Sequence, residues 1–273
     1  MRRLGFVGAG RMGRPMVRRL LEARYKVRVL GRSAAARQAL ATDGAQVTAD
    51  IAEVGVGVDA VLVCVHTDEQ VLQACLGGGL LDGMDRGSLI VIHTTGSPQT
   101  VTAIAEHAAP RGIGVVDAPV SGGPHDVANG RLTLFVGGAD DAVSRVRPVL
   151  DCYGDPVLLV GPAGAGQRVK LINNALFAAQ IGLLSSAVRL GEQLGVDEAV
   201  LLSALPRASA ASRALSGAAA RGSVALFAAA VGEFVSKDLL VVRAVAAEMG
   251  ADLGALDDPL NALARALERA DAG

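Results

Sequence analysis

The beginning of the chain contains the feature that most restricts its fold, a short apolar run followed by closely spaced glycines. The run Leu4–Val7 is followed by Gly8, Gly10 and Gly13, in G-x-G-x-x-G spacing, and a helical pattern then begins. Glycines at these spacings allow a tight turn, close approach of the backbone to a pyrophosphate and tight helix–strand packing. The positive end of the helix then faces the anion. The segment therefore predicts a dinucleotide site, with an ordinary turn containing chance glycines as the alternative.

Short runs rich in Val, Ile and Leu alternate with helical patterns through the first part of the chain. The runs are Leu4–Val7, Val27–Leu30, Ala60–Val65, Leu89–His93, Val115–Asp117, Thr133–Val136 and Val157–Val160. Helical patterns between them include Met12–Ala23, Ala34–Thr42 and Pro98–Ala108. Apolar runs without polar alternation are typical of a parallel sheet covered on both faces. The pattern predicts an α/β fold, a doubly wound Rossmann-type domain over residues 1–162.

The pattern changes after the glycine-rich segment "GPAGAG", beyond which no strand is expected. Residues from about 166 to 194 fit one long helix, which we assign as an inter-domain helix over 163–194. An all-α domain is expected over 195–273. Its helical patterns are Asp197–Leu205, Ser209–Ala219, Phe227–Glu248 and Pro259–Ala270.

Composition and charge argue against several classes of partner. The net charge of −1 gives no general attraction to nucleic acid or to an anionic membrane. We see no run of about 18 uncharged apolar residues, so we expect no membrane span. The three cysteines form no C-x-x-C pair and the four histidines no H-x-x-x-H pair, so we expect neither a disulfide nor a metal site. A cytoplasmic location fits this cysteine usage.

The end of the second predicted strand indicates which dinucleotide is bound. An acid there would accept hydrogen bonds from the ribose 2′-hydroxyl of NAD. This chain instead has Arg32 and Ser33, with Arg37 one turn later. A guanidinium suits a 2′-phosphate and the serine hydroxyl can donate a further bond. We therefore favour NADP over NAD, the alternative being that Arg32 is a solvated loop residue.

Four ordered blocks resemble the β-hydroxyacid dehydrogenase family, which includes 3-hydroxyisobutyrate dehydrogenase, tartronate semialdehyde reductase and glyoxylate/succinic semialdehyde reductases. The blocks are "GFVGAGRMGRPM", "DAPVSGG" at Asp117–Gly123, "GAGQRVKLINN", and "KDLLV" beginning with Lys237 and Asp238. The resemblance covers nearly the whole chain. It implies an oxidoreductase that uses a nicotinamide cofactor and a small carboxylate substrate bearing a hydroxyl or carbonyl group.

The resemblance also implies roles for individual residues. Lys170 would be the acid/base and Asn174 would orient the substrate beside it. The substrate carboxylate would be held at Ser121, Gly122 and Gly123, with Thr95 near the nicotinamide. The residues implied to bind the cofactor are Gly8, Ala9, Gly10, Arg11, Met12, Gly13, Arg32, Ser33, Arg37, Val65, His66, Thr95 and Lys237.

The chemistry of hydride transfer is consistent with these roles. Reduction of a carbonyl builds negative charge on its oxygen, and a proton donor within hydrogen-bond reach must neutralise it. Burial and the positive charge of an oxidised nicotinamide would lower the pKa of a lysine toward neutrality. Lys170 and Asn174 are four residues apart, which places them on one helix face. The alternative is a surface lysine beside asparagines that only cap or cross-link helices.

Some residues depart from the family pattern or have a competing interpretation. Ile92 and His93 stand where many relatives have an acid and its neighbour, and Ala230 stands where many have an aromatic residue. Both departures bear on the shape of the substrate pocket. Lys237 could instead form an ion pair with Glu233, four residues earlier on the same helix. Asp238 could orient neighbouring polar groups or simply cap charge.

Three other functions remain as alternatives. Imine reductases have a similar architecture but generally replace the lysine, often with Asp or Tyr. Relatives of 6-phosphogluconate dehydrogenase need further phosphate ligands, and a non-catalytic NADP-binding scaffold or sensor would not need Lys170, Asn174 and Ser121 together. The apolar long helix also indicates a homodimer or homotetramer.

Overall fold

The computed structural model describes the backbone of residues 1–271 and their side chains except those at 233, 266 and 268–271. The chain divides into two compact units, and the second begins at Leu171. The boundary lies inside the long helix α9 (Ala165–Gln193). The bounds of this helix are close to the expected 163–194. The first residues of α9, through Lys170, therefore belong to the sheet-containing unit.

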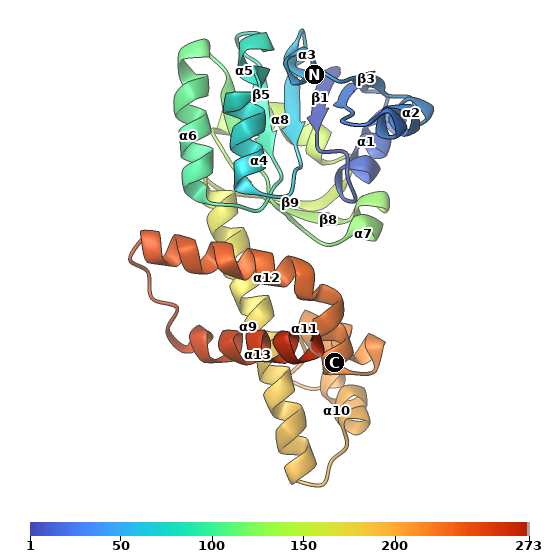
Figure 1. Ribbon diagram of the computed structural model, residues 1–273, viewed down its shortest axis with the longest axis vertical. Helices are drawn as coiled ribbons and strands as arrows, with labels where there is room; N and C mark the ends of the chain where they lie inside the picture. The colour runs from blue at the N-terminus through green and yellow to red at the C-terminus, as the bar shows by residue number, and fades with distance from the viewer. Residues whose placement is uncertain (272–273) are drawn as a thin grey trace. The chain divides into compact units, whose positions relative to one another are not determined.

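The first unit contains one nine-stranded sheet (Figure 1). The strands are β1 (Arg3–Val7), β2 (Lys26–Leu30), β3 (Gln46–Thr48), β4 (Ala60–Val63), β5 (Leu89–Ile92), β6 (Gly114–Asp117), β7 (Val120–Ser121), β8 (Leu132–Gly137) and β9 (Gly154–Gly161). Their order is β3-β2-β1-β4-β5-β6-β8-β7, with β9 paired to β8. Strands β1 to β6 are parallel, which confirms the Rossmann-type fold, but β8 runs antiparallel to both β6 and β7.

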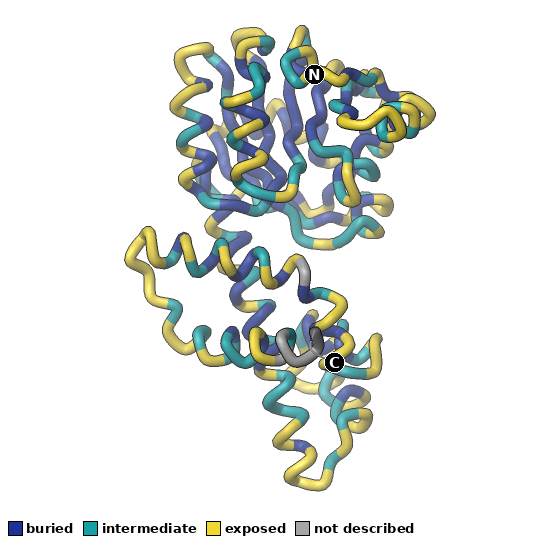
Figure 2. The backbone as a smooth tube through the Cα atoms, in the orientation of Figure 1, coloured by how far each residue is buried: buried dark blue, intermediate teal, exposed yellow. Residues whose placement is uncertain are grey.

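Two hydrophobic cores cover the two faces of this sheet. Alternate residues of each central strand enter opposite cores: Leu62 lies in one, whereas Val61 and Val63 lie in the other. Both faces are therefore apolar, which explains strands without polar alternation. Figure 2 shows the buried strands lying between helices whose outer faces are exposed.

The helices of the first unit follow the strands in the expected rhythm. They are α1 (Gly13–Glu22), α2 (Ala34–Thr42), α3 (Ile51–Gly55), α4 (Asp68–Leu72), α5 (Leu80–Gly83), α6 (Pro98–Ala108), α7 (Pro124–Ala128) and α8 (Asp140–Leu150). The predicted bounds of α2 and α6 are those observed, because a serine caps each helix. Ser33 accepts from the N–H of Ala36, and Ser97 accepts from that of Gln99.

The second unit is helical in all its described elements. Besides most of α9, it contains α10 (Glu198–Ala204), α11 (Arg213–Arg221), α12 (Val224–Glu248) and α13 (Asp257–Asp271). Its core includes Ile181, Leu215, Phe227 and Leu263. A side chain at Gly182 would collide with the backbone of Pro259, so glycine allows α9 and α13 to approach closely.

Helix α9 is long and apolar enough to cross a membrane by length and composition alone. Its best 18-residue window has a mean hydropathy of 1.4 and is 33% buried. A core helix of a water-soluble protein passes the same test, and α9 contributes buried residues such as Ala178 and Ile181 to the core of the second unit. Because α9 contains charged residues such as Arg168 and Lys170, a search for uncharged runs does not detect how apolar the rest of the helix is.

Candidate active site

The glycine turn after β1 has the shape that a pyrophosphate requires. Gly8 has φ +96°, and a Cβ there would collide with the carbonyl oxygen of Cys64. A Cβ at Gly13 would collide with the carbonyl of Gly8, so this glycine lets α1 pack tightly. By contrast, a Cβ at Gly10 would meet nothing within 4 Å. Its backbone therefore leaves open space in which an anion can approach.

Helix α1 begins directly after this turn. Met12 is its N-cap residue and makes no side-chain capping bond, and the first turn contains no acid. Ala9 is half-buried, whereas Arg11 is exposed. The positive end of the helix and a nearby cation both favour a bound phosphate group. These residues fit the pyrophosphate of a dinucleotide.

The turn after β2 carries the residues expected at the adenosine ribose. Arg32 is exposed. Arg37 reaches back and donates from Nη1 to the carbonyl of Gly31 at 2.9 Å. Ser33 accepts from the N–H of Ala36, and its own O–H can still donate. The structure thus brings Arg37 and the turn together and leaves Arg32 at the surface.

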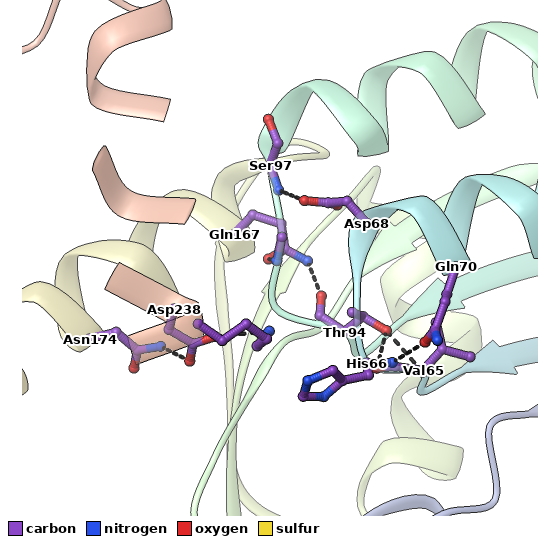
Figure 3. A network of polar contacts seen from close by, with 11 residues as sticks. Val65, His66, Asp68, Gln70, Thr94, Ser97, Gln167, Asn174 and Asp238 are labelled. Atoms are coloured by element: carbon purple, nitrogen blue, oxygen red, sulfur yellow. Dashed lines mark hydrogen bonds and ion pairs between the residues drawn. The ribbon is translucent and has the colours of Figure 1, made fainter. Parts of the chain in front are cut away.

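The loops that follow β4 and β5 are joined by hydrogen bonds (Figure 3). The Thr94 hydroxyl accepts from the N–H of Val65 and donates to its carbonyl, both at 3.0 Å. The N–H of His66 donates to Gln70 at 2.8 Å. In a doubly wound fold, ligands bind beyond the carboxyl ends of the strands. Val65, His66 and Thr95 all follow such ends.

The turn expected to hold the substrate carboxylate forms between β7 and α7. Gly122 has φ +127°, a conformation that favours glycine. The N–H of Gly123 donates to the carboxylate of Asp126 at 2.8 Å. This N–H is therefore engaged within the protein. The Ser121 hydroxyl and the backbone of Gly122 remain as the groups of this turn that can meet a carboxylate.

Asp117 at the end of β6 anchors the beginning of α9. Its Oδ1 accepts from the N–H of Gly164 at 2.6 Å, and its Oδ2 accepts from the N–H of Gln167 at 2.8 Å. A carboxylate at this end of a helix also complements the helix dipole. Burial raises the pKa of Asp117 to about 6, although the two N–H donors act in the opposite direction. In the sequence this residue ends a predicted strand and begins "DAPVSGG", but neither feature assigned it a role of its own.

Lys170 lies one turn beyond this anchor. It is only 8% exposed. Gln167, three residues earlier, is 1% exposed and binds the backbone of the loop after β5. Lys170 is thus the last residue of the first unit, on a helix turn fixed to the sheet.

Asn174 follows one helical turn later and belongs to the second unit. Its Nδ2 donates to Oδ2 of Asp238 at 2.6 Å (Figure 3). Its Oδ1 accepts from Asn173 at 3.1 Å. The carboxylate can only accept, so it fixes which end of the amide faces it. Asp238 therefore orients Asn174, a role that the sequence left open.

Lys237 lies beside Asp238 on α12. Its Nζ is 2.9 Å from Oδ1 of Asp238. Among the described side chains that oxygen has no hydrogen-bond partner, so this contact is an ion pair without hydrogen-bond alignment. The alternative ion pair with Glu233 lies outside the described side chains. Asp238 is buried, and it contacts both Asn174 and Lys237.

Packing explains His93, one of the residues that depart from the family pattern, but not Ala230. His93 is 2% exposed in the sheet, donates from Nδ1 to the carbonyl of Ala118 and accepts from the Tyr153 hydroxyl at Nε2. Burial lowers the pKa of His93 to about 4. Ala230 is exposed on α12, and of its aromatic neighbours Phe227 is buried in the helical core. His93 and Phe227 are therefore structural residues.

Comparisons with known proteins agree with this geometry. A family model described as the NAD binding domain of 6-phosphogluconate dehydrogenase matches residues 3–161. A second, described as the NAD-binding domain of NADP-dependent 3-hydroxyisobutyrate dehydrogenase, matches residues 164–272. The 3-hydroxyisobutyrate dehydrogenase of Pseudomonas aeruginosa is 34% identical over 213 residues, which are 78% of this chain and 72% of the relative. The NAD-dependent L-serine dehydrogenase of that organism is 33% identical over 216 residues, 79% of this chain and 72% of the relative.

Solved structures are also similar to this chain. Mycobacterium tuberculosis 3-hydroxyisobutyrate dehydrogenase with L-serine has a TM-score of 0.87 at 27% identity, covering 97% of this chain and 93% of that one. The imine reductase of Streptomyces aurantiacus shares the fold, with a TM-score of 0.65 at 18% identity over 100% of this chain and 95% of that one. The chain belongs to the β-hydroxyacid dehydrogenase family of nicotinamide-dependent oxidoreductases.

Proposed function

We propose that the protein is an NADP-dependent dehydrogenase that interconverts a small β-hydroxy acid and its semialdehyde, with Lys170 as acid/base. The observation that carries the proposal is a buried lysine, 8% exposed, on a helix turn that Asp117 and Gln167 fix to the carboxyl edge of a dinucleotide-binding sheet. A buried lysine at such an edge suits proton transfer better than a solvated surface position.

The chain's own groups would divide the work as follows. The turn at Ser121 and Gly122 would hold the substrate carboxylate, and Asn174, oriented by Asp238, would hold the reacting oxygen. In the oxidative direction the neutral amine of Lys170 takes the hydroxyl proton as the hydride leaves carbon. In the reductive direction its ammonium returns that proton to the carbonyl oxygen. The nicotinamide supplies only the hydride acceptor or donor.

Relatives suggest which hydroxy acids to test first. The names of two similar enzymes specify 3-hydroxyisobutyrate and L-serine. Both compounds carry a carboxylate and a CH₂OH group on one carbon. The assay would follow reduction of NADP⁺ and NAD⁺ with both acids, and oxidation of NADPH with short semialdehydes and cyclic imines. Turnover with cyclic imines alone would indicate an imine reductase, and NADPH binding without any turnover a scaffold or sensor.

Replacement of Arg32 by aspartate is expected to reverse the cofactor preference. The exchange removes a charge-assisted hydrogen bond to the 2′-phosphate, worth about 1.5–3 kcal/mol, so kcat/KM with NADP⁺ should fall about 10- to 100-fold. The new carboxylate can accept from the 2′-hydroxyl of NAD⁺, so kcat/KM with NAD⁺ should hold or rise. Steady-state kinetics with both cofactors measure this. An unchanged preference would make Arg32 a solvated loop residue. Arg207→Asp, which makes the same exchange at an exposed arginine of the second unit, is the matched control.

We further propose a homodimer or homotetramer assembled through α9. Four exposed apolar residues of α9 lie four or seven positions apart and so share one helix face: Ile172, Leu176, Leu183 and Leu190. Leu194, in the turn directly after the helix, extends this stripe. Leu194 is 71% exposed and Ile172 66%. A monomer would leave this stripe in water, whereas an identical helix from a second copy would cover it.

The double variant Leu183→Asp, Leu190→Asp is expected to dissociate the oligomer. Two buried charges at an interface cost several kcal/mol, so light scattering after size-exclusion chromatography should give the monomer mass. The control Arg189→Asp changes charge on the same helix at an exposed residue. A wild-type protein that is already monomeric would contradict the proposal.

A further inference from the structure

The side chain of Gln167 lies between two elements that the proposed function requires. Its backbone N–H donates to Asp117 at 2.8 Å, which places Gln167 in the anchored first turn of α9. Its amide then reaches the loop after β5, where Nε2 donates to the carbonyl of Thr94 and Oε1 accepts from the N–H of Gly96. These bonds are 2.8 and 3.0 Å long, and Gln167 is 1% exposed. One side chain thus binds the backbone on both sides of Thr95.

Only a glutamine can make this pair of bonds. The carbonyl of Thr94 requires a donor and the N–H of Gly96 an acceptor, and the side-chain amide supplies both in one plane. Glutamate would place an oxygen against the carbonyl of Thr94, and asparagine is one methylene shorter. The two partners also fix the orientation of the amide.

Other residues also hold the loop after β5, so its position depends on several contacts besides those of Gln167. Thr94 bonds to Val65, and Asp68 accepts from the N–H of Ser97 at 2.8 Å (Figure 3). A Cβ at Gly96 would collide with the Asp68 carboxylate, so the loop packs directly on it. Gln167 links this loop to α9, and Lys170 lies three residues beyond it on the same helix.

We propose that Gln167 is a positioning residue, which sets the distance between Thr95 at the carboxyl edge of the sheet and Lys170 on α9. This inference rests on the proposed function, because it assigns Gln167 to the same site. The amide does not contact the reacting atoms. It keeps the loop that faces the nicotinamide and the helix turn that carries the acid/base in one fixed arrangement.

The test is a set of variants measured for turnover and for the environment of bound cofactor. In Gln167→Leu, kcat should fall on the order of 10- to 100-fold because misplacement of catalytic groups by about 1 Å has this effect. The dissociation constant of NADPH should stay near that of the wild type, since the glycine turn is unchanged. The kcat of Gln167→Glu should fall by a similar factor, although glutamate matches glutamine in size. Gln99→Leu, on the exposed beginning of α6, should behave as wild type.

Two readouts separate positioning from a loss of stability. The effect of Gln167→Leu on kcat should largely disappear in a Thr95→Val background, because the two changes act on one contact. The emission spectrum of bound NADPH should also shift in Gln167→Leu, which requires no substrate. Equal kcat losses in both backgrounds, or an unshifted spectrum, would overturn the proposal. An inactive wild type would instead overturn the proposed function, while the spectrum still decides the role of Gln167.

Discussion

Replacing Lys170 by methionine is expected to lower kcat by about 10²- to 10⁴-fold, the range that general acid–base catalysis contributes. Methionine keeps the length and the apolar contacts of the buried chain and removes only the amine. The affinity for NADPH should be retained, because the glycine turn at Gly8–Gly13 lies on other elements of the sheet. Steady-state kinetics and fluorescence titration with NADPH measure the two effects separately.

A small external amine provides a further check on this role. In Lys170→Ala, ethylamine should restore part of the lost turnover, since it can occupy the vacated space and transfer the proton. Lys26→Met, which changes an exposed lysine on β2, should retain full activity. Normal turnover by Lys170→Met would exclude Lys170 as the acid/base and with it the proposed mechanism.

Replacing Asp117 by alanine is expected to have the largest effect on stability. The change leaves the N–H groups of Gly164 and Gln167 without their acceptors in a buried site. Each unsatisfied buried N–H costs about 1–3 kcal/mol, so the free energy of unfolding should fall by about 2–6 kcal/mol. Urea denaturation measures this loss. Asp50→Ala, which removes an exposed helix cap on α3, should cost only about 1 kcal/mol.

The pH dependence of this loss follows from the raised pKa of Asp117. Burial raises the folded-state pKa to about 6, above the unfolded value of about 3.9. The folded state then binds more protons between these values, so the contribution of Asp117 is full below pH 4 and declines as the pH rises to 6. The contribution of Asp117 to the free energy of unfolding declines by an amount on the order of 3 kcal/mol. The stability gap between wild type and Asp117→Ala should therefore narrow from pH 4 to pH 7. A gap that widens would mean that the N–H donors dominate and lower the pKa.

The sequence predicted most of the sheet and several helix bounds because the signals are local. Runs such as Leu4–Val7 are apolar throughout, and Ser33 and Ser97 cap their helices within the next turn. Strands β3 and β7 were missed because "QVT" and "VS" are too short to form an apolar run. Their pairing, and the antiparallel direction of β8, depend on contacts between distant segments.

The site was predictable where a residue acts through its own backbone or its place in a motif. The glycine turn and the spacing of Lys170 and Asn174 belong to that class. Asp238 was expected to orient polar groups or to cap charge, but its partner was not identified. Asp117 and Gln167 were assigned no role because each acts on a segment far away in the sequence. Their only signals were a carboxylate at the end of an apolar run and an amide one turn before a lysine. Neither signal indicates which distant segment the residue binds.

The most direct test of the central claim is transfer of deuterium from substrate to cofactor. Wild-type protein would be incubated with NADP⁺ and 3-hydroxyisobutyrate or L-serine carrying two deuterium atoms on the hydroxymethyl carbon, and the reduced cofactor analysed by mass spectrometry. The proposed dehydrogenase should yield NADPH heavier by one mass unit with at least one of these acids, and Lys170→Met should yield almost none. Cofactor that binds but gains no deuterium from either acid would contradict the account.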